Sequence, residues 1–391
     1  MQAPVMPVWA EINLDSLRHN IEAIRTIVPC ESMMVAVVKA NAYGHGAVEC
    51  SKLFLENGAD SLAVATLSEA IELRRAGISS PVLILGYSSP GQAGAILRWS
   101  VTPTVYTVEV AETLSHAADE LGVTTDIHIK VDTGLGRIGF QTDEASLTTI
   151  SEINRLPNIN IEGIFTHFAL ADSKDKNYTV KQFDSFKTFL KLLSERGISI
   201  PIKHASNSAA IMDLPEYGLN MVRPGCILYG VYPSGDAPRD RLVLKPAMSF
   251  KTRVTHVKTV PPGTGISYGL TYTTESESII GSLSVGYADG YSRILSNKAE
   301  VWVEGVRAPV IGRVCMDQSM VDLTGLKNPL RGSTVTLFGD GLSGEPRVED
   351  VAGWMGSIPD EVVSGISRRV PRVYTRQGKV VKVVDYLQGP D

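Results

Sequence analysis

The first 240 or so residues alternate short apolar runs with longer segments that are apolar on one face only. The first run covers Met33–Val38. Seven more follow near residues 61–65, 81–86, 101–106, 125–131, 160–166, 201–205 and 220–223. Continuous apolar runs are typical of parallel strands that are buried on both faces. Eight such strands, each followed by a helix or a short turn, predict an α/β protein whose N-terminal part is an eight-stranded (β/α) barrel.

The segments between the runs carry helix signals. In residues 14–28 the apolar side chains fall on one helical face, and Asp15 is a candidate N-cap. Thr66 and Glu69 have the spacing of a capping box, which predicts a helix over residues 67–77.

The pattern changes after about Leu242. Strand-like stretches separated by Gly- and Pro-rich turns now dominate, at residues 247–260, 279–287, 308–323, 333–339 and 378–387. Only residues 348–356 and 359–367 have a helical pattern. We therefore predict a barrel domain over residues 1–242 and a mostly β C-terminal domain over 243–391. The first ten or so residues could pack with the C-terminal domain.

Charge and composition exclude several classes of protein. The chain has 391 residues, of which 43% are hydrophobic, and a net charge of -5 without a basic block, which argues against a nucleic-acid partner. No apolar run approaches the ~18 residues that a membrane span needs, and the N-terminus does not resemble a signal peptide. The four cysteines have no Cys-x-x-Cys spacing. We expect reduced thiols, a cytoplasmic location and no metal site.

Polar residues stand where the predicted barrel strands end. Lys39 follows the first strand, Arg137 the fifth, His167 the sixth and residues 206–208 the seventh, and Arg223 ends the eighth. The active site of a β/α barrel lies at the C-terminal ends of its strands, so these side chains should surround one mouth. Each residue alone is more often structural than catalytic. Their joint placement is what points to a site.

The loops after the seventh and eighth strands suit a phosphoryl group. They offer small polar residues and glycine, namely Asn207, Ser208, Gly225 and Cys226. Such loops often hold phosphate in barrels, through backbone N–H groups and a helix N-terminus. Lys39 on the opposite side of the mouth could form a Schiff base with a phosphorylated aldehyde. These features together describe pyridoxal 5'-phosphate.

The stretch Gly134–Gly139, "GLGRIG", matches the G-x-G-x-x-G fingerprint of dinucleotide-binding domains. That fingerprint belongs near the start of an open-sheet domain. Here it follows the fifth of eight strands, so we reject a nicotinamide cofactor.

The sequence resembles the alanine racemases over nearly its whole length. The matching motifs, in chain order, are "AVVKANAYGHG", "KVDTGLGRIGF", "GIFTHFALAD", "HASNSAA", "MVRPGCILYG", "ISYGLTY", "VGYADGY", "GRVCMDQSMVDL" and "RRVPRVY". The resemblance implies a pyridoxal-phosphate enzyme in which Lys39 binds the cofactor covalently. It further implies that His167 packs at the pyridine ring and that Arg223 donates to the pyridine nitrogen. The implied phosphate ligands are Tyr43, Ser208, the backbone of Gly225 and Cys226, and Tyr374.

The resemblance also implies a two-base mechanism in a head-to-tail homodimer with shared active sites. Lys39 would serve one face of the substrate, and Tyr268 of the partner chain the other. Arg137 would hold the substrate carboxylate, and Lys130 would be carbamylated and orient Arg137. The partner chain would also contribute Cys315, Met316 and Asp317, while Tyr287 and Tyr374 would narrow the entrance.

The implied function is interconversion of L- and D-alanine, which supplies D-alanine for peptidoglycan. Three alternatives stay open at this point. A racemase of the same build could act on serine, lysine or several amino acids. A barrel-type decarboxylase would usually place an acidic residue at the pyridine nitrogen, where this chain has Arg223. A non-catalytic pyridoxal-phosphate-binding protein would need the barrel alone.

Overall fold

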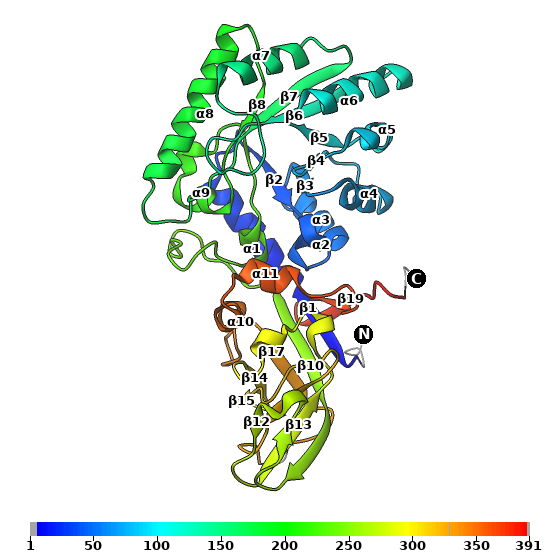
Figure 1. Ribbon diagram of the computed structural model, residues 1–391, viewed down its shortest axis with the longest axis vertical. Coiled ribbons are helices and arrows are strands. Elements are labelled where there is room, and N and C mark those ends of the chain that lie inside the picture. Colours follow the sequence, from blue (N-terminus) through cyan, green and yellow to red (C-terminus); the bar gives the residue numbers. More distant parts are fainter. Residues whose placement is uncertain (1–5, 328, 389–391) are drawn as a thin grey trace. The chain divides into compact units, whose positions relative to one another are not determined.

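The computed structural model describes residues 6–327 and 329–388, shown as a ribbon in Figure 1. The chain divides into two compact units. We call Arg18–Ala42 with Ala47–Leu244 the barrel unit, and Met1–Leu17, Tyr43–Gly46 and Lys245–Asp391 the β unit. Residues 43–46 therefore belong to the β unit, although in the sequence they lie between two segments of the barrel unit.

The barrel unit contains a closed barrel of eight strands in the order of the sequence. All neighbouring strands are parallel. The strands are β2 (Met33–Val37), β3 (Ser61–Val64), β4 (Val82–Ile84), β5 (Thr102–Val105), β6 (Thr125–Lys130), β7 (Ile159–Phe165), β8 (Ile202–His204) and β9 (Met221–Val222). The predicted fold class is thereby confirmed, and each predicted apolar run of the barrel overlaps one strand.

Helices surround the strands of the barrel unit on the outside (Figure 1). They are α3 (Ala47–Glu56), α4 (Leu67–Arg75), α5 (Ala93–Arg98), α6 (Val108–Leu121), α7 (Glu144–Ile153), α8 (Asn177–Glu195) and the short α9 (Ser208–Asp213). At α4, the capping box between Thr66 and Glu69 is formed as predicted.

The first helix, α1 (Leu14–Ile27), corrects one prediction. Asp15 is not its N-cap but lies in its first turn. The Asn13 side chain accepts hydrogen bonds from the backbone N–H groups of Asp15 and Ser16, at 2.9 and 3.1 Å. Asparagine and aspartate both cap helices well, so residue type alone does not distinguish Asn13 from Asp15.

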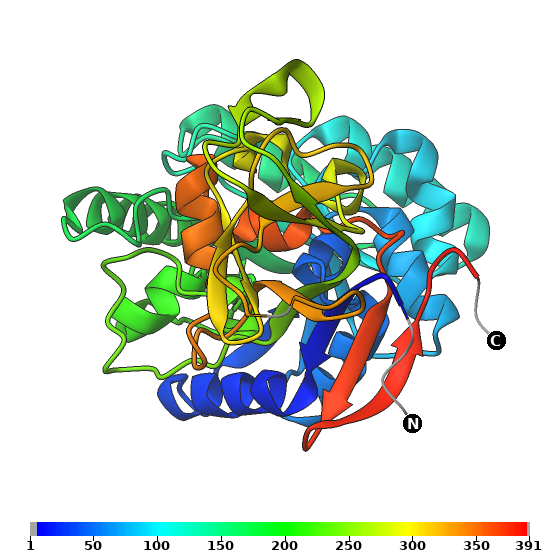
Figure 2. The same cartoon turned by 90° about the horizontal axis from the view of Figure 1, so that it is seen from below.

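The β unit is built on a sheet in the order β15-β14-β17-β10-β1-β18-β19, with β13 and β16 continuing from β10. Its strands are β1 (Val8–Asn13), β10 (Met248–Val260), β13 (Ser278–Leu283), β14 (Glu300–Val303), β15 (Val306–Pro309), β16 (Ser319–Asp322), β17 (Thr334–Phe338), β18 (Arg372–Arg376) and β19 (Lys379–Val384), with a separate pair β11 (Gly265–Ile266) and β12 (Tyr272–Thr273). Two helices complete it, α10 (Val348–Met355) and α11 (Pro359–Ser364). β1 pairs antiparallel with β10 and parallel with β18, and β18 and β19 lie side by side (red in Figure 2).

The predicted strand over residues 308–323 is wrong in its middle part. Only its two ends are strands, in β15 and β16, and residues 311–318 form an irregular loop. This loop carries Cys315, Met316 and Asp317.

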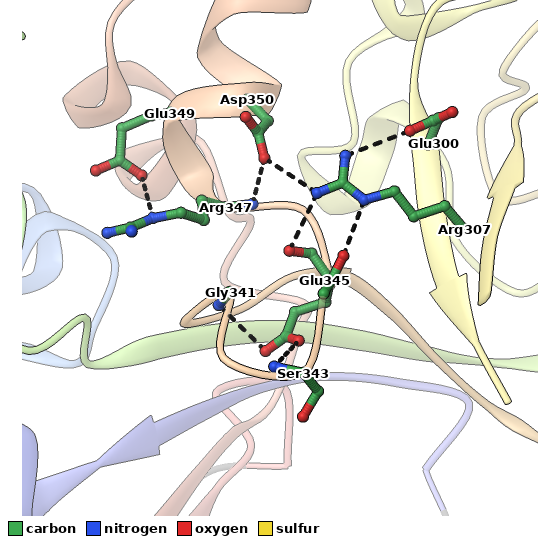
Figure 3. A network of polar contacts seen from close by, with 9 residues as sticks. Glu300, Arg307, Gly341, Ser343, Glu345, Arg347, Glu349 and Asp350 are labelled. Carbon is green, nitrogen blue, oxygen red and sulfur yellow. Dashed lines mark hydrogen bonds and ion pairs between the residues drawn. The ribbon is translucent and has the colours of Figure 1, made fainter. Parts of the chain in front are cut away.

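A polar network holds the loop between β17 and α10 in place (Figure 3). Arg307, on β15, pairs with the carboxylates of Glu300 and Asp350 at 3.3 and 3.6 Å. Its Nε donates to the Gly344 carbonyl at 2.8 Å. The Glu345 carboxylate accepts from backbone N–H groups of the same loop. One arginine thus connects the β14–β15 hairpin to the loop and to the start of α10.

Within residues 6–327 and 329–388, no helix combines the length and apolarity that crossing a membrane requires. The same residues contain no group of three or more His, Cys, Asp or Glu side chains that could hold a metal ion. The four cysteines are free thiols.

Candidate active site

Lys39 follows β2 at the mouth of the barrel and is half-buried. The residues directly after it form a left-handed helical turn. Ala40, Asn41 and Ala42 have φ of 52, 55 and 54° and ψ of 48, 46 and 54°, and Tyr43 continues with a φ of 50°. A left-handed conformation costs an L-residue roughly 1–2 kcal/mol, and non-glycine residues rarely adopt it in succession. Such a turn persists only where the surrounding structure fixes it.

Arg223 follows β9 and is buried below the mouth. Its Nη2 donates to the carbonyls of Thr166 and Ala205 at 2.9 and 3.0 Å and to Nδ1 of His167 at 3.2 Å. Its Nη1 donates to Nδ1 of His204 at 2.7 Å. Burial, with a smaller effect from Arg137, lowers the pKa of Arg223 to about 9, so the guanidinium stays protonated at neutral pH.

The guanidinium of Arg223 has donors to spare. Its Nη2 hydrogens are shared among three acceptors, and one Nη1 hydrogen is taken by His204. An arginine has five N–H donors. The Nε hydrogen and the second Nη1 hydrogen therefore have no acceptor among the residues that the structure describes. They are available to an acceptor on a bound molecule.

A chain of hydrogen bonds leads from Arg223 away from the mouth. His204 Nε2 lies 2.9 Å from His128 Nδ1, and His128 Nε2 lies 3.3 Å from the Glu162 carboxylate. Arginine only donates, so Nδ1 of His204 accepts and its Nε2 carries the hydrogen. His128 must then accept at Nδ1 and donate from Nε2 to Glu162. Burial, followed by Arg223 and other neighbouring cations, holds the pKa of His204 well below its usual range, which keeps His204 neutral.

His167 follows β7 and accepts from Arg223 through Nδ1. Burial lowers its pKa well below the usual range, and four cations add to the effect, in the order Arg223, Arg137, Lys130 and Lys39. His167 is therefore neutral. These interactions also show that the structure brings the predicted barrel residues of the site together.

Lys130 is the last residue of β6 and is buried. Its Nζ donates to the Val131 carbonyl at 2.7 Å and lies 5.3 Å from the centre of the Phe165 ring. Burial is the main cause that lowers its pKa to about 7, and the charge of Arg223 adds to it. A substantial fraction of Lys130 is therefore a neutral, nucleophilic amine at physiological pH.

The "GLGRIG" loop is organised by one carboxylate. Asp132 accepts hydrogen bonds from the backbone N–H groups of four successive residues, 134 to 137, at 2.8 to 3.2 Å. The φ angles of Gly134 and Gly136 are 131 and 72°, and this tight path favours glycine at both positions. The loop presents Arg137, which is exposed at the barrel mouth.

The two loops after β8 and β9 are joined at the predicted phosphate site. The backbone N–H of Gly225 donates to the Ser208 hydroxyl at 2.9 Å. The Asn207 side chain accepts from the N–H of Ala210 and caps the short α9. Cys226 is buried and begins a 3-10 turn. The structure thus brings these four residues together in a lining of small side chains and backbone.

Tyr374 is buried in the β unit, on β18. Its hydroxyl donates to the carbonyl of His45 at 3.0 Å, in the segment that begins with the half-buried Tyr43. A Cβ on Gly46 would lie 1.8 Å from the Tyr374 hydroxyl, so only glycine fits there.

The remaining predicted residues meet in one part of the β unit, which we call the loop cluster and define as residues 266–270, 286–289 and 313–318. The Ser267 hydroxyl donates to the Arg313 carbonyl at 2.7 Å and lies 3.4 Å from Sγ of Cys315. The backbone N–H of Tyr287 donates to the Cys315 carbonyl at 3.0 Å. The cluster thereby carries Tyr268, Tyr287, Cys315, Met316 and Asp317 on connected loops.

Arg369 fixes the loop cluster from one side. Its Nε donates to the buried Asp289 at 2.6 Å, and its Nη2 donates to Asp317 at 2.7 Å. Asp289 also accepts from the backbone N–H of Gly286 at 2.9 Å. Two of the three loops are therefore held by charged hydrogen bonds, which are stronger than neutral ones.

Sequence reasoning missed the support for Arg223. His128, Glu162 and His204 were not among the predicted residues, although His204 opens the "HASNSAA" motif. Glu162 and His204 lie 34 and 76 residues from His128 in the chain. The available signal was a pair of histidines within predicted barrel strands, where apolar residues dominate.

A barrel mouth with a strand-end lysine, a buried arginine with spare donors and a cradle of small residues, in a chain with a separate β unit, fits the barrel-type amino-acid racemase that the resemblance implies. The comparisons with known proteins agree with this class. The family model "Alanine racemase, N-terminal domain" matches residues 12–233, and "Alanine racemase, C-terminal domain" matches residues 247–374.

Individual relatives match over nearly the full length. An alanine racemase of Methanococcus maripaludis is 52% identical over 368 residues, which cover 94% of this chain and 98% of the relative. The solved alanine racemase of Clostridium difficile 630 is 46% identical with a TM-score of 0.95 and covers 98% of this chain and 100% of its own. The Bacillus anthracis alanine racemase with bound L-Ala-P is 40% identical with a TM-score of 0.93, over 99% and 100% of the two chains. The chain belongs to the alanine racemase family and is an enzyme of the isomerase class.

Proposed function

We propose that this enzyme interconverts L-alanine and D-alanine with pyridoxal 5'-phosphate as its cofactor, and supplies D-alanine for peptidoglycan in the cytoplasm. The observation that carries the proposal is the grouping of Lys39, His167 and Arg223 at one barrel mouth. The relative of known structure with bound L-Ala-P supports the same chemistry.

The residues at the mouth fit pyridoxal phosphate. The spare N–H donors of Arg223 suit a pyridine nitrogen, which can accept a hydrogen bond. Ser208 and the backbone of Gly225 and Cys226 offer the small, polar lining that a phosphate group needs. Asn207 supports this lining through its cap on α9, and Tyr43 and Tyr374 would complete the phosphate contacts.

When bound, pyridoxal phosphate supplies an aldehyde for covalent attachment and a conjugated ring that withdraws electrons from the substrate Cα–H bond. Lys39 holds the cofactor and then moves a proton at its Nζ on one face of the substrate. Arg223 keeps its own proton and gives none to the ring nitrogen. By withholding its proton, Arg223 would keep the withdrawal of electrons weak and favour return of the proton to Cα over side reactions.

Inversion of Cα needs a second acid–base group on the opposite face, and we assign this role to the hydroxyl of Tyr268. Tyr268 is highly exposed on the loop cluster. Exposure of this aromatic side chain, and of Met316 in the same loop cluster, supports a position that a second subunit covers. We therefore propose a homodimer in which each active site takes Lys39 from one chain and Tyr268 from the other. Cys315, Asp317 and Tyr287 would line the substrate side of the same loop cluster.

Arg137 would hold the substrate carboxylate, and Lys130 would orient Arg137. We propose that the neutral amine of Lys130 attacks the carbon of carbon dioxide, so that an N–C bond forms as one C=O π bond opens, and the nitrogen loses a proton to solvent. The resulting carbamate is an anion. It would pair with the guanidinium of Arg137 and orient it toward the substrate.

A stereospecific assay over a panel of amino acids tests the proposed function. We expect racemisation of alanine in both directions, and much slower turnover of serine and lysine. Reduction with borohydride should label Lys39 and no other lysine with the cofactor. Racemisation of another amino acid with greater efficiency, or decarboxylation of the substrate, would contradict the assignment.

A further inference from the structure

The left-handed turn after Lys39 must be stabilised by contacts outside the turn, and two hydrogen bonds within the barrel unit do this. The Asn41 side chain accepts from the backbone N–H of Ala47 at 2.9 Å, at the start of α3. The backbone N–H of Ala40 donates to Oε1 of Glu69 at 2.6 Å. Ala40 directly follows Lys39 in the chain, so the second contact holds the backbone next to the reactive residue.

Glu69 connects the mouth ends of two neighbouring strands. Its Oε2 accepts from the backbone N–H groups of Ala65 and Thr66, directly after β3, at 2.8 and 3.2 Å. Its Oε1 accepts from Ala40, after β2. The two strands are paired in parallel, with Val37 opposite Ala63. One carboxylate therefore fixes the backbone where both strands leave the barrel.

Helix capping explains only half of these contacts. In a capping box, the carboxylate at the third helical position accepts from the N-cap backbone, and the N-cap hydroxyl accepts in return. Thr66 and Glu69 form both bonds. The bond from Oε1 to Ala40 spans 29 residues and contributes nothing to the end of α4. A glutamine could cap the helix equally well. It could not accept hydrogen bonds from the residues after both β2 and β3, because only one of its two terminal atoms is an oxygen.

We propose that Glu69 is a positioning residue for Lys39, acting through the N–H of Ala40 to fix the left-handed turn. The inference rests on the proposed role of Lys39 as the cofactor-binding base. The turn sets the direction in which the Lys39 side chain leaves the backbone. Proton transfer depends steeply on geometry, so loss of the Ala40 bond should act on turnover more than on substrate binding.

Two variants and one matched control separate this role from helix capping. Glu69→Asp keeps a carboxylate at the N-terminus of α4 but is one methylene too short to reach both strand ends. Glu69→Gln replaces one acceptor oxygen with a donor. Thr66→Ala removes the other half of the same capping box and leaves the Ala40 bond intact.

The measurements are kcat and KM for L-alanine, the melting temperature, and backbone hydrogen exchange of the holoenzyme in peptides over residues 36–46 and 66–76. For both Glu69 variants we expect kcat to fall about 10- to 100-fold with KM within about threefold. Exchange should rise over residues 36–46. For Thr66→Ala we expect a lower melting temperature, faster exchange over 66–76 and kcat within about twofold of the wild type.

The proposal is overturned if Glu69→Asp keeps the wild-type kcat and exchange over residues 36–46. It is also overturned if Glu69→Asp and Thr66→Ala lower kcat by the same factor. Glu69→Asp decides the question if Glu69→Gln does not fold. A wild-type enzyme without racemase activity would instead contradict the proposed function, and the exchange comparison would still show whether Glu69 holds the turn.

Discussion

The barrel mouth and the loop cluster differ most in how far their functional side chains are buried. Arg223 and Lys130 expose 3% and 2% of their surface, and each is hydrogen bonded within the barrel unit. Tyr268 and Met316 expose 74% and 53%. The barrel unit therefore fixes its polar groups by itself, whereas the β unit presents its aromatic and apolar groups on the outside.

This difference separates two ways of preparing a catalytic group. Burial and neighbouring charges set the protonation of His167, Lys130 and Arg223 before any ligand arrives. The loop cluster instead fixes backbone positions, through Ser267 and Arg369, and leaves the side chains of Tyr268 and Met316 to be enclosed by another surface. Burial in the barrel depends on the fold of one chain. We propose that enclosure of the loop-cluster side chains depends on two chains.

The strongest test of this comparison combines lesions from the two regions. Lys39→Ala and Tyr268→Phe homodimers should each lose at least about 1,000-fold in activity, since each lacks one acid–base group. When the two variants are mixed and allowed to exchange subunits, hybrid dimers have one doubly altered site and one intact site. About a quarter of all sites should then be active if chains associate at random in closed dimers.

The control is each variant treated alone, which should stay inactive. If both residues came from one chain, every site in a hybrid would carry one lesion. Mixing would then restore no activity, and the division of roles between two chains would be wrong.

Lys130 tests whether burial sets protonation in the barrel. Its pKa is about 7 in the folded chain and has a reference value of 10.5. The unfolded chain therefore binds more protons between these values, and the contribution of Lys130 to stability rises with pH in this window. In buffer free of carbon dioxide, the stability of the wild type relative to Lys130→Met should rise by about 2–3 kcal/mol between pH 7 and 9, measured by urea unfolding.

Bicarbonate provides the matched condition. A carbamate on Lys130 no longer titrates as an amine. Bicarbonate should therefore reduce the pH dependence of the stability difference between the wild type and Lys130→Met. A high-resolution density map should show a carboxylated Nζ. An equal pH dependence of wild type and variant without carbon dioxide would show that Lys130 is not perturbed by burial.

Gly286 tests whether the loop cluster depends on backbone contact. A Cβ at this position would lie 2.3 Å from the carbonyl oxygens of both Cys315 and Met316. Gly286→Ala should destabilise the protein by about 1–3 kcal/mol and reduce kcat, because the loops that carry Tyr287 and Met316 must separate. Gly353→Ala, in the interior of α10 with nothing within 4 Å of its Cβ, is the control and should be neutral or stabilising. Equal effects of both changes would exclude a special role for the contact.

The smallest expected effect concerns strain at the barrel mouth. Ala40 is exposed and has a φ of 52°. Ala40→Gly should be neutral or stabilise the protein by up to about 1 kcal/mol, because glycine adopts this conformation without a clash. Ala117→Gly, inside the right-handed helix α6, should cost about 0.5–1 kcal/mol. Calorimetry of the two variants would disprove strain in the turn if Ala40→Gly proved as costly as Ala117→Gly.

The sequence predicted the barrel well because its signals are local. Strands such as β2 and β4 are continuous apolar runs, and the Thr66–Glu69 capping box depends on residues three apart. β1 was missed because it takes its place in the sheet from β10 and β18, more than 230 residues away. The middle of residues 308–323 was predicted as strand from its apolar residues, but the loop there follows contacts with residues 267 and 287.

The candidate site shows the same limit. Lys39, His167 and Arg223 could be found because a barrel places strand ends together. The left-handed turn could not, since alanine favours right-handed helices and only tertiary contacts reverse that preference. The chain from Arg223 to Glu162 was also missed, because hydrogen bonds between distant strands leave no local pattern.

The position of β1 has a consequence for synthesis on the ribosome. β1 ends at Asn13, but its parallel neighbour β18 begins only at Arg372. At roughly 5–20 residues per second, β1 leaves the ribosome about 20–70 seconds before that neighbour is made. All eight barrel strands emerge within this interval, so the barrel can close first. Until β18 arrives, the first strand of the nascent chain keeps an open edge that chaperones can protect and that other chains can join.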